Sequence, residues 1–425
     1  MKVFQSKLIR YGSAVFYILL SFLSYYCACY RLPVGLKYGI NLVVFGWACA
    51  AFFIHPQFEH AKFCMRFFVL FFFPYFMFWI WSVGIWISEF QTWTYILRGS
   101  QNIIYMLTNL LFVVASVYLF DEDLVTYTVI AMSMANFAVF VEIGLAYGFP
   151  RLIVEYITLL LTFADNTGAA VRRLELHDMV YGWGVYVVYF MIHRKFKKES
   201  DAWKFLASLF FFTLAMKRVA IPGAAAAVIF YWVLKKLDPR LVRKLITPIA
   251  TVCVAGLFAY LAIIRSGLFL EIADRFDINL MSRDRLWTFY QDYYWLSPTY
   301  LGQGIRFIYT FGTHYQKAID IPISVVHNVF LELYIETGFW CWMIWLFYEL
   351  SFRVKRLYEW YDPEVAIGMM AMNVYVFFTY LTDNTSFYFP INVEYRLVMM
   401  TWCYEILKYK KKVIVEPIYD DLYPW

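Results

Sequence analysis

Charged residues are scarce in this 425-residue sequence: they make up 16% of it, whereas ordinary soluble domains have about a quarter. Hydrophobic residues make up 62% and aromatic residues 22%. A soluble chain of this length cannot bury so much apolar surface in its interior. The apolar residues also fall into blocks of about 20, the length that crosses the hydrocarbon layer of a bilayer. The sequence therefore predicts an integral membrane protein.

Other features are missing as well, and each absence excludes a class of protein. The seven cysteines all lie within or at the edge of apolar blocks, so neither a disulfide framework nor a cysteine zinc site is supported. The net charge of +6 comes from short basic runs between apolar blocks, so we expect no nucleic-acid partner. Lys2, Lys7 and Arg10 precede the first apolar block, but no convincing small-residue cleavage site follows. We therefore expect a retained first helix rather than a signal peptide.

The apolar blocks suggest about twelve spanning helices. We place them at roughly 12–30, 36–54, 67–87, 101–120, 124–147, 174–193, 203–216, 219–234, 245–264, 327–350, 364–381 and 388–407. Most of the 37 basic residues stand in alternate connecting segments, which puts those segments and both termini in the cytoplasm. The expected fold is an all-α polytopic membrane protein with four parts: spans 1–9 in 1–265, a large extracytoplasmic loop at 266–325, spans 10–12 in 326–407, and a cytoplasmic tail at 408–425.

Lys217 and Arg218 interrupt an apolar stretch that is basic at both ends. The pieces on either side, 203–216 and 219–234, are shorter than the usual minimum of about 17 residues for a span. The turn between them should therefore lie below the outer membrane surface. A cation buried there costs on the order of 2.5–3.5 kcal/mol, so an anion or water must compensate it.

The 266–325 loop contains one predicted amphipathic helix, over 282–296. Ser282 is its expected N-cap, and Leu286, Tyr290 and Tyr293 share one face. The Ser-Pro pair at 297–298 should end it. Gly302 and Gly304 bracket a turn farther along.

Three segments carry a family pattern in a fixed order: Ala215–Arg218 at a hairpin tip, Ser282–Trp287 at the start of the loop helix, and His327–Glu332 entering the next span. They resemble the O-antigen ligase and polymerase superfamily, most of all the Wzy-type polymerases of O-antigen, capsule and exopolysaccharide. An arginine-containing hairpin, Arg-x-x-x-Trp, Gly-x-Gly and His-Asn-x-x-Leu recur there in this order. The resemblance covers roughly 200–340. Where the family often has Ser-Gly-Arg, this chain has Met281-Ser282-Arg283. Either Arg283 or Arg285 could therefore take the place of the family's arginine.

The resemblance implies a GT-C-like, metal-independent glycosyltransferase of the bacterial plasma membrane, with no cofactor. Its substrates are polyprenyl-pyrophosphate-linked glycans in the lipid bilayer, and a chain-length regulator and a flippase are its expected partners. Arginine suits pyrophosphate because its planar fork binds phosphate oxygens and stays charged. The candidates for this role are Arg218, Arg283, Arg285 and Lys217. Histidine can accept a proton from a hydroxyl near neutral pH, which makes His327 the candidate base.

Simpler roles compete for the same residues. An arginine at a helix end, such as Arg218, often only extends its charged group toward the membrane surface. Arg283 and Arg285 stand two residues apart, so they point in different directions on a helix, and a charged pair of this kind is usually solvated. A histidine at a helix start, such as His327, is more often a capping or interfacial residue than a catalyst. His314, in the loop, is an alternative base but fits a solvated residue better.

Glu336 follows His327 by nine residues, which on a helix means about 900° of rotation and roughly 13 Å of rise. It therefore faces away from His327, and should pair with a cation or cap a buried polar network. Asp383, near an outer turn, is the candidate partner for His327, and Asn328 is a supporting residue. His177 lies between acidic residues, where a hydrogen-bond cluster fits better than a metal site. We expect no bound metal.

Two other functions share parts of the pattern. An O-antigen ligase, which transfers glycan to a lipid A core, uses the same motif residues. A lipid-linked oligosaccharide flippase also has about twelve spans, but it needs polar residues along a central cavity rather than a long outer loop. A secondary transporter needs broken helices in matching halves. The sequence shows no such pair.

Overall fold

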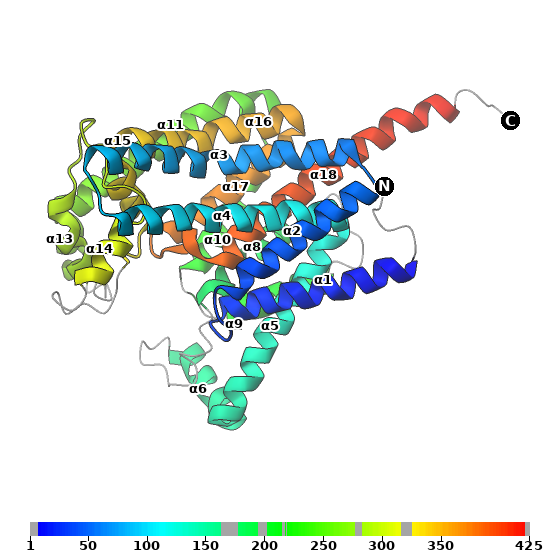
Figure 1. Cartoon of the computed structure of the whole chain (residues 1–425), viewed down its shortest axis with the longest axis horizontal. Helices are drawn as coiled ribbons and strands as arrows, with labels where there is room; N and C mark the ends of the chain where they lie inside the picture. Colours follow the sequence, from blue (N-terminus) through cyan, green and yellow to red (C-terminus); the bar gives the residue numbers. More distant parts are fainter. Residues whose placement is uncertain are drawn as a thin grey trace. The chain divides into compact units, whose positions relative to one another are not determined.

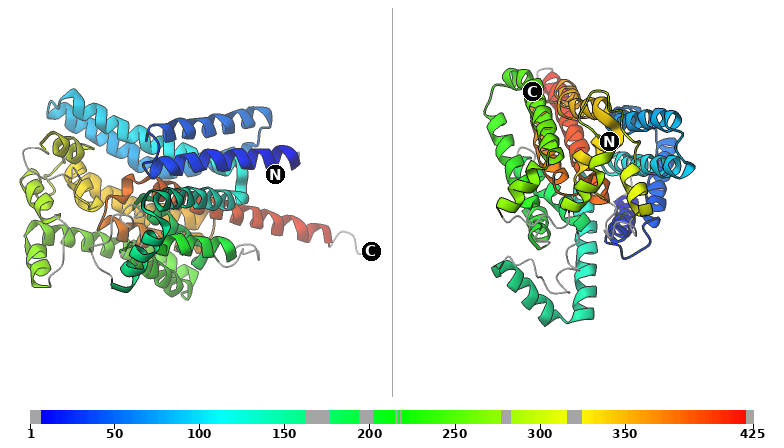
Figure 2. Two further views of the ribbon diagram at one scale, coloured as in Figure 1. Left: turned by 90° about the horizontal axis from the view of Figure 1, so that it is seen from below. Right: turned by 90° about the vertical axis from the view of Figure 1, so that its left-hand side faces the viewer.

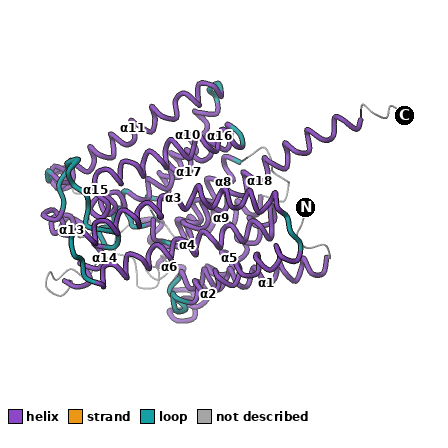
Figure 3. Tube along the Cα trace, turned by 45° about the horizontal axis from the view of Figure 1, so that its top comes forward, coloured by secondary structure: helices purple, strands orange, loops and turns teal. Residues whose placement is uncertain are grey.

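The computed structural model describes residues 7–162, 177–193, 202–214, 217, 219–276, 283–315 and 325–420. Within these ranges all regular structure is helical and no strand is present, as Figure 3 shows. The α-helical fold class is confirmed.

Six helical stretches in the described ranges are long and apolar enough to cross a membrane. They are Ile9–Ala28, Leu36–Ile54, Phe58–Ser88, Trp93–Tyr147, Pro239–Arg265 and Val329–Trp360. Three shorter apolar helices occupy Asp178–Ile192, Ala202–Leu214 and Ala220–Lys235. The protein is therefore membrane-embedded. The Trp93–Tyr147 stretch contains two of the predicted spans, because the short 3-10 turn η1 (Asp121–Asp123) separates α4 (Trp93–Phe120) from α5 (Leu124–Tyr147).

The first of two compact units comprises Met1–Phe67, Thr108–Ile229 and Phe387–Trp425. Its helices are α1 (Lys7–Ala28), α2 (Leu36–Ile54), α5, α6 (Phe149–Thr162), α8 (His177–Ile192), α9 (Ala202–Leu214) and α18 (Phe389–Asp420), with parts of α3, α4 and α10. α1 packs against α2 and α5, and α8 packs against α9 and α18. α6 turns back from the end of α5 (Figure 1 and Figure 2).

A fully buried carboxyl lies in the core of this first unit. Glu394 of α18 accepts hydrogen bonds from the hydroxyls of Tyr25 and Tyr186. The Tyr186 oxygen also lies 2.5 Å from Thr128 Oγ1. A carboxyl inside an apolar bundle is costly unless it is paired, and these hydroxyls provide the partners.

The second unit comprises Phe68–Leu107 and Phe230–Ser386. It holds the remaining parts of α3 (Phe58–Ser88), α4 and α10 (Ala220–Lys235), followed by α11 (Pro239–Arg265), α12 (Leu268–Arg275), α13 (Arg283–Tyr290), η3 (Gln291–Tyr293), α14 (Phe307–Tyr315), α15 (Val329–Phe347), the π-helical turn η4 (Tyr348–Phe352), α16 (Arg353–Trp360), α17 (Pro363–Tyr380) and most of η5 (Thr385–Phe387). α11 packs along α15, α16 and α17. α13 and α14 lie next to each other (Figure 1), with the Phe289 and Phe311 rings 5.9 Å apart.

The predicted loop helix over 282–296 is too long. α13 ends at Tyr290 and continues only as the η3 turn to Tyr293. Tyr294 then adopts an extended conformation and is buried, with its ring near that of Tyr334 and beneath the Arg265 guanidinium. Burying this aromatic ring ends the helix before the Ser-Pro pair is reached. The predicted N-cap, Ser282, lies outside the described residues.

The single span predicted over 327–350 is also wrong in detail. α15 begins at Val329 and is interrupted at Gly338, whose φ of 71° is non-helical. The loop segment 300–306, here called the strap, fills the interruption. The Phe339 N–H donates to the Tyr300 carbonyl (2.9 Å), and the Gly304 N–H donates to the Glu336 carbonyl (2.7 Å). The strap is thus hydrogen-bonded to the carbonyls and N–H groups that the broken helix exposes.

Glycine is required where the strap meets the break. A Cβ on Gly338 would stand 2.2 Å from the Leu301 carbonyl carbon, and one on Gly302 would stand 2.6 Å from the Glu336 oxygen. Both glycines also have φ between 71° and 100°. Close backbone approach and left-handed conformation therefore both exclude a side chain. The strap, which is part of the predicted loop, is therefore packed tightly against α15.

Candidate active site

His327 lies just before α15 rather than on it, which corrects the predicted helix start. Asn328 is the N-cap, and its Oδ1 accepts a hydrogen bond from the Leu331 N–H (3.0 Å). His327 itself has a φ of 49°, in the left-handed region that few non-glycine residues adopt. Such conformations cost about 1–3 kcal/mol and often occur at functional sites. The turn leaves the imidazole 25% exposed.

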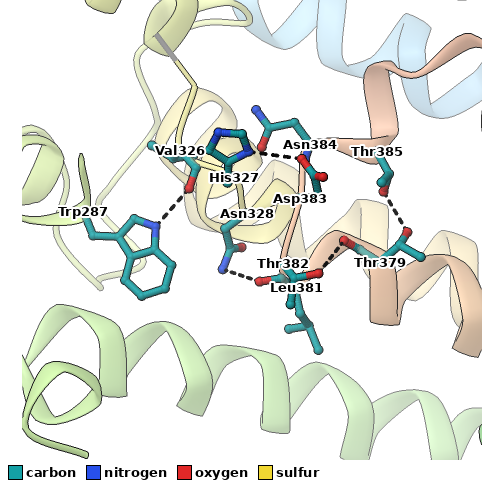
Figure 4. A network of polar contacts seen from close by, with 10 residues as sticks. All are labelled: Trp287, Val326, His327, Asn328, Thr379, Leu381, Thr382, Asp383, Asn384 and Thr385. Atoms are coloured by element: carbon teal, nitrogen blue, oxygen red, sulfur yellow. Dashed lines mark hydrogen bonds and ion pairs between the residues drawn. The ribbon is translucent and has the colours of Figure 1, made fainter. Parts of the chain in front are cut away.

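The imidazole pairs with the carboxylate of Asp383, in the turn that follows α17. His327 Nδ1 lies 3.1 Å from Asp383 Oδ1, as Figure 4 shows. An ionised carboxylate only accepts hydrogen bonds, so Nδ1 is the donor in this pair. Nε2 of the neutral ring is then left as a proton acceptor. The structure thus brings the predicted partner, Asp383, to His327.

The turn after α17 fixes the position of Asp383. The Thr379 carbonyl accepts hydrogen bonds from the N–H groups of Thr382 (3.3 Å) and Asp383 (3.1 Å). The hydroxyl oxygens of Thr379 and Thr385 lie 2.7 Å apart across the turn. These contacts hold the carboxylate at the imidazole (Figure 4).

Arg283 and Arg285 have different surroundings, as expected for residues two apart. Arg285 is exposed, whereas Arg283 is half-buried, and the described residues provide no hydrogen-bond partner for its buried Nε. Trp287, one turn farther along α13, donates from Nε1 to the Val326 carbonyl (3.0 Å). This bond fastens α13 beside the residue that precedes His327. Arg283 is therefore the arginine of this pair that belongs to the site.

Tyr260 of α11 also belongs to the site. Its hydroxyl accepts a hydrogen bond from Asn328 Nδ2 (2.8 Å) and lies close enough to Arg283 for that charge to act on it. The Phe269 ring packs against both Tyr260 and Trp287. In the sequence, Tyr260 is one aromatic residue among many in an apolar block. Its place near the end of that block was the only signal for it.

Glu336 lies in a separate polar cluster, in line with the expectation that it does not orient His327. Its Oε1 accepts a hydrogen bond from the Ile308 N–H in the first turn of α14 (3.2 Å), and the charge of Arg306 acts on it. Glu332, one turn earlier, is fully buried, and neither of its carboxyl oxygens has a hydrogen-bond partner in the part of the chain that the structure describes. Burial, and then the charges of Glu332 and Glu336, raise the pKa of the Tyr290 hydroxyl. The cluster anchors the strap and α14 on α15.

The predicted hairpin tip is described only in part. α9 and α10 are separate helices of 13 and 16 residues, both shorter than an ordinary span. Lys217 between them is half-buried, and its carbonyl accepts a hydrogen bond from the Ala220 N–H (3.0 Å). Arg218 and the side chain of His177 lie outside the described residues. His314 is exposed on α14, as a solvated residue would be.

The described residues of the second unit thus hold a His–Asp pair, in which one imidazole nitrogen is left without the carboxylate. Arg283 lies near Tyr260, which hydrogen-bonds the neighbouring Asn328. In the ranges that the structure describes, no group of three His, Cys, Asp or Glu residues is arranged to hold a metal ion. No protein-family model matches the chain, and no curated protein matches it at a significant level.

Proposed function

We propose that the chain is a polysaccharide polymerase that joins polyprenyl-pyrophosphate-linked repeat units on the outer side of a bacterial plasma membrane. The observation that carries this proposal is the His327–Asp383 pair, 3.1 Å apart, with Arg283 near Tyr260, the hydrogen-bond partner of Asn328. A general base and an anion-binding arginine are the two groups that this reaction needs. The likeness of the segments around these residues to the Wzy-type polymerases supports the same assignment.

In the proposed reaction the acceptor hydroxyl attacks the anomeric carbon of the donor sugar. The hydroxyl proton passes to Nε2 of His327 as the new C–O bond forms. The bond between the anomeric carbon and the pyrophosphate oxygen breaks, and the electron pair leaves with the lipid pyrophosphate. Asp383 holds the ring in the tautomer that accepts the proton and stabilises the resulting imidazolium, as carboxylates do in catalytic triads.

Arginine side chains bind the departing pyrophosphate in this scheme. Arg283 is one such group, because its Nε is buried and has no hydrogen-bond partner among the described residues. Arg218, with Lys217 next to it, is a further candidate from the sequence alone, on the strength of its predicted depth below the membrane surface. Arg285 is solvated. The reaction itself calls for neither a metal ion nor a cofactor.

We also propose the finer membrane arrangement. About twelve spans in a GT-C-like fold leave both termini in the cytoplasm and the 266–325 loop outside, in keeping with the distribution of basic residues. The lipid-linked glycan arrives through a flippase, and a chain-length regulator limits the polymer.

A glycan ladder from cells that lack the gene tests this function. The deletion should leave single repeat units, and the wild-type gene should restore long chains. A ligase would instead leave finished polymer on the polyprenyl carrier. A flippase would leave repeat units on the cytoplasmic side of the membrane. Either of these two results replaces the polymerase assignment.

A further inference from the structure

Asn384 is a buried polar residue next to the proposed base. Only 3% of it is exposed, and neither Nδ2 nor Oδ1 has a hydrogen-bond partner among the residues that the structure describes. Its backbone N–H donates to Asp383 Oδ1 (2.8 Å), the same oxygen that pairs with His327. Figure 4 shows the amide pointing toward the His327 imidazole. The unpaired amide is therefore part of the immediate surroundings of the base.

An unpaired amide in this place does not serve the stability of the fold. Burying a polar group without partners costs about 1–3 kcal/mol, and an apolar residue of the same size avoids that cost. Asn328, at the start of α15, shows the contrast: its Oδ1 and Nδ2 both have protein partners. Buried polar groups in native proteins are nearly always paired, and no described residue pairs with the Asn384 amide, so the amide is free to bind another molecule.

We propose that Asn384 binds the acceptor sugar, at the substituent next to the hydroxyl that His327 deprotonates. This assignment rests on the proposed polymerase function. An amide offers one accepting oxygen and two donating N–H groups, so it pairs best with a group that both donates and accepts. A hydroxyl or an acetamido group on a sugar ring does both. An ionised pyrophosphate only accepts, and the Asp383 carboxylate beside Asn384 disfavours a second anion.

The test uses Asn384→Leu, which keeps the number and branching of the side-chain heavy atoms and removes both polar atoms. The protein is purified in nanodiscs and supplied with lipid-linked repeat units as donor. The acceptor is the repeat-unit glycan released from its carrier by mild acid. We expect the KM for the acceptor to rise roughly tenfold or more, because two neutral hydrogen bonds are lost. The KM for the donor should stay within about twofold, and the melting temperature should be unchanged or higher.

Thr382→Val is the matched control, because Thr382 belongs to the same turn but already hydrogen-bonds the Thr379 carbonyl (3.4 Å). It should keep the wild-type KM for the acceptor. An Asn384→Leu protein with an unchanged acceptor KM overturns the assignment. So does a lower melting temperature with a fall in kcat at constant KM, since that pattern means that the amide only supports the turn. A wild-type protein that makes no polymer refutes the polymerase proposal before any variant is compared.

Discussion

At the scale of single residues, the proposed reaction depends most on the His327 imidazole and on the Asp383 carboxylate, which lies 3.1 Å from it. Asp383 is 56 residues from His327, and only its place at an outer turn suggested the pairing. Tyr260 showed only its place near the end of an apolar block, and whether the polar atoms of Asn384 have a partner depends on contacts between distant segments, which the sequence does not reveal. Glu332 was quoted as part of a motif and overlooked as a buried charge, although an ionisable residue inside a span is itself a functional signal.

The Asp383 carboxylate should be essential to the rate. In Asp383→Asn the amide can donate to Nδ1, which favours the tautomer that carries its proton on Nε2 and removes the acceptor site. We expect the initial rate of polymer formation from lipid-linked units to fall by about a hundredfold or more. Asp292→Asn, at an exposed aspartate of η3, is the control and should keep the wild-type rate. An Asp383→Asn rate within about twofold of wild type means that the pair is only structural.

The two arginines of α13 make a second comparison. Arg283→Gln should lower the rate at least roughly tenfold, because a charge-assisted hydrogen bond to pyrophosphate contributes about 1.5–3 kcal/mol. Arg285→Gln should stay within about twofold of wild type, since that side chain is exposed. Both rates are measured in the same polymerisation assay. If Arg285→Gln lowers the rate more than Arg283→Gln does, Arg285 rather than Arg283 binds the pyrophosphate.

At the scale of the elements, the sequence predicted the turn at Gly302 and Gly304 but not its binding partner. The break in α15 at Gly338 is 36 residues from Gly302, and local patterns carry no information on such a contact. The true start of α15 was visible in principle, because Asn328 is a good N-cap. The family motif drew attention to His327 instead.

Substituting Gly338 should loosen the strap. A Cβ there meets the Leu301 backbone, and φ is 71°, so Gly338→Ala should lower the free energy of unfolding by about 2 kcal/mol or more. Gly256→Ala is the control: nothing lies within 4 Å of its Cβ, and alanine in the middle of α11 should be neutral or stabilising by up to about 1 kcal/mol. Unfolding curves followed by tryptophan fluorescence give both values. If Gly338→Ala is as stable as Gly256→Ala, the strap does not require glycine at position 338.

At the scale of the whole molecule, composition was enough for the membrane class, and the structure agrees. The number of spans is harder to predict, because α8, α9 and α10 have only 16, 13 and 16 residues. At 1.5 Å per residue such helices cover about 20–24 Å, less than the roughly 30 Å of the hydrocarbon layer. Hydropathy alone cannot decide whether a helix of this length crosses.

Reporter fusions test the proposed topology. Alkaline phosphatase, which is active only outside the cytoplasm, should be active when inserted at Asp292 in the loop. It should be inactive when fused after the C-terminus, because the basic run before that end stays inside. Green fluorescent protein at the same two positions should give the opposite result. An inactive phosphatase at Asp292 contradicts the outward placement of the loop.

The glycan ladder of the deletion strain, complemented with site variants, tests the polymerase proposal most directly. His327→Asn is the key variant, because asparagine tolerates the left-handed backbone but cannot take the proton. We predict single repeat units with His327→Asn and with Arg218→Ala, and long chains with the wild type and with the exposed-residue control His314→Asn. Long chains in both the His327 and the Arg218 variants would contradict the proposed mechanism.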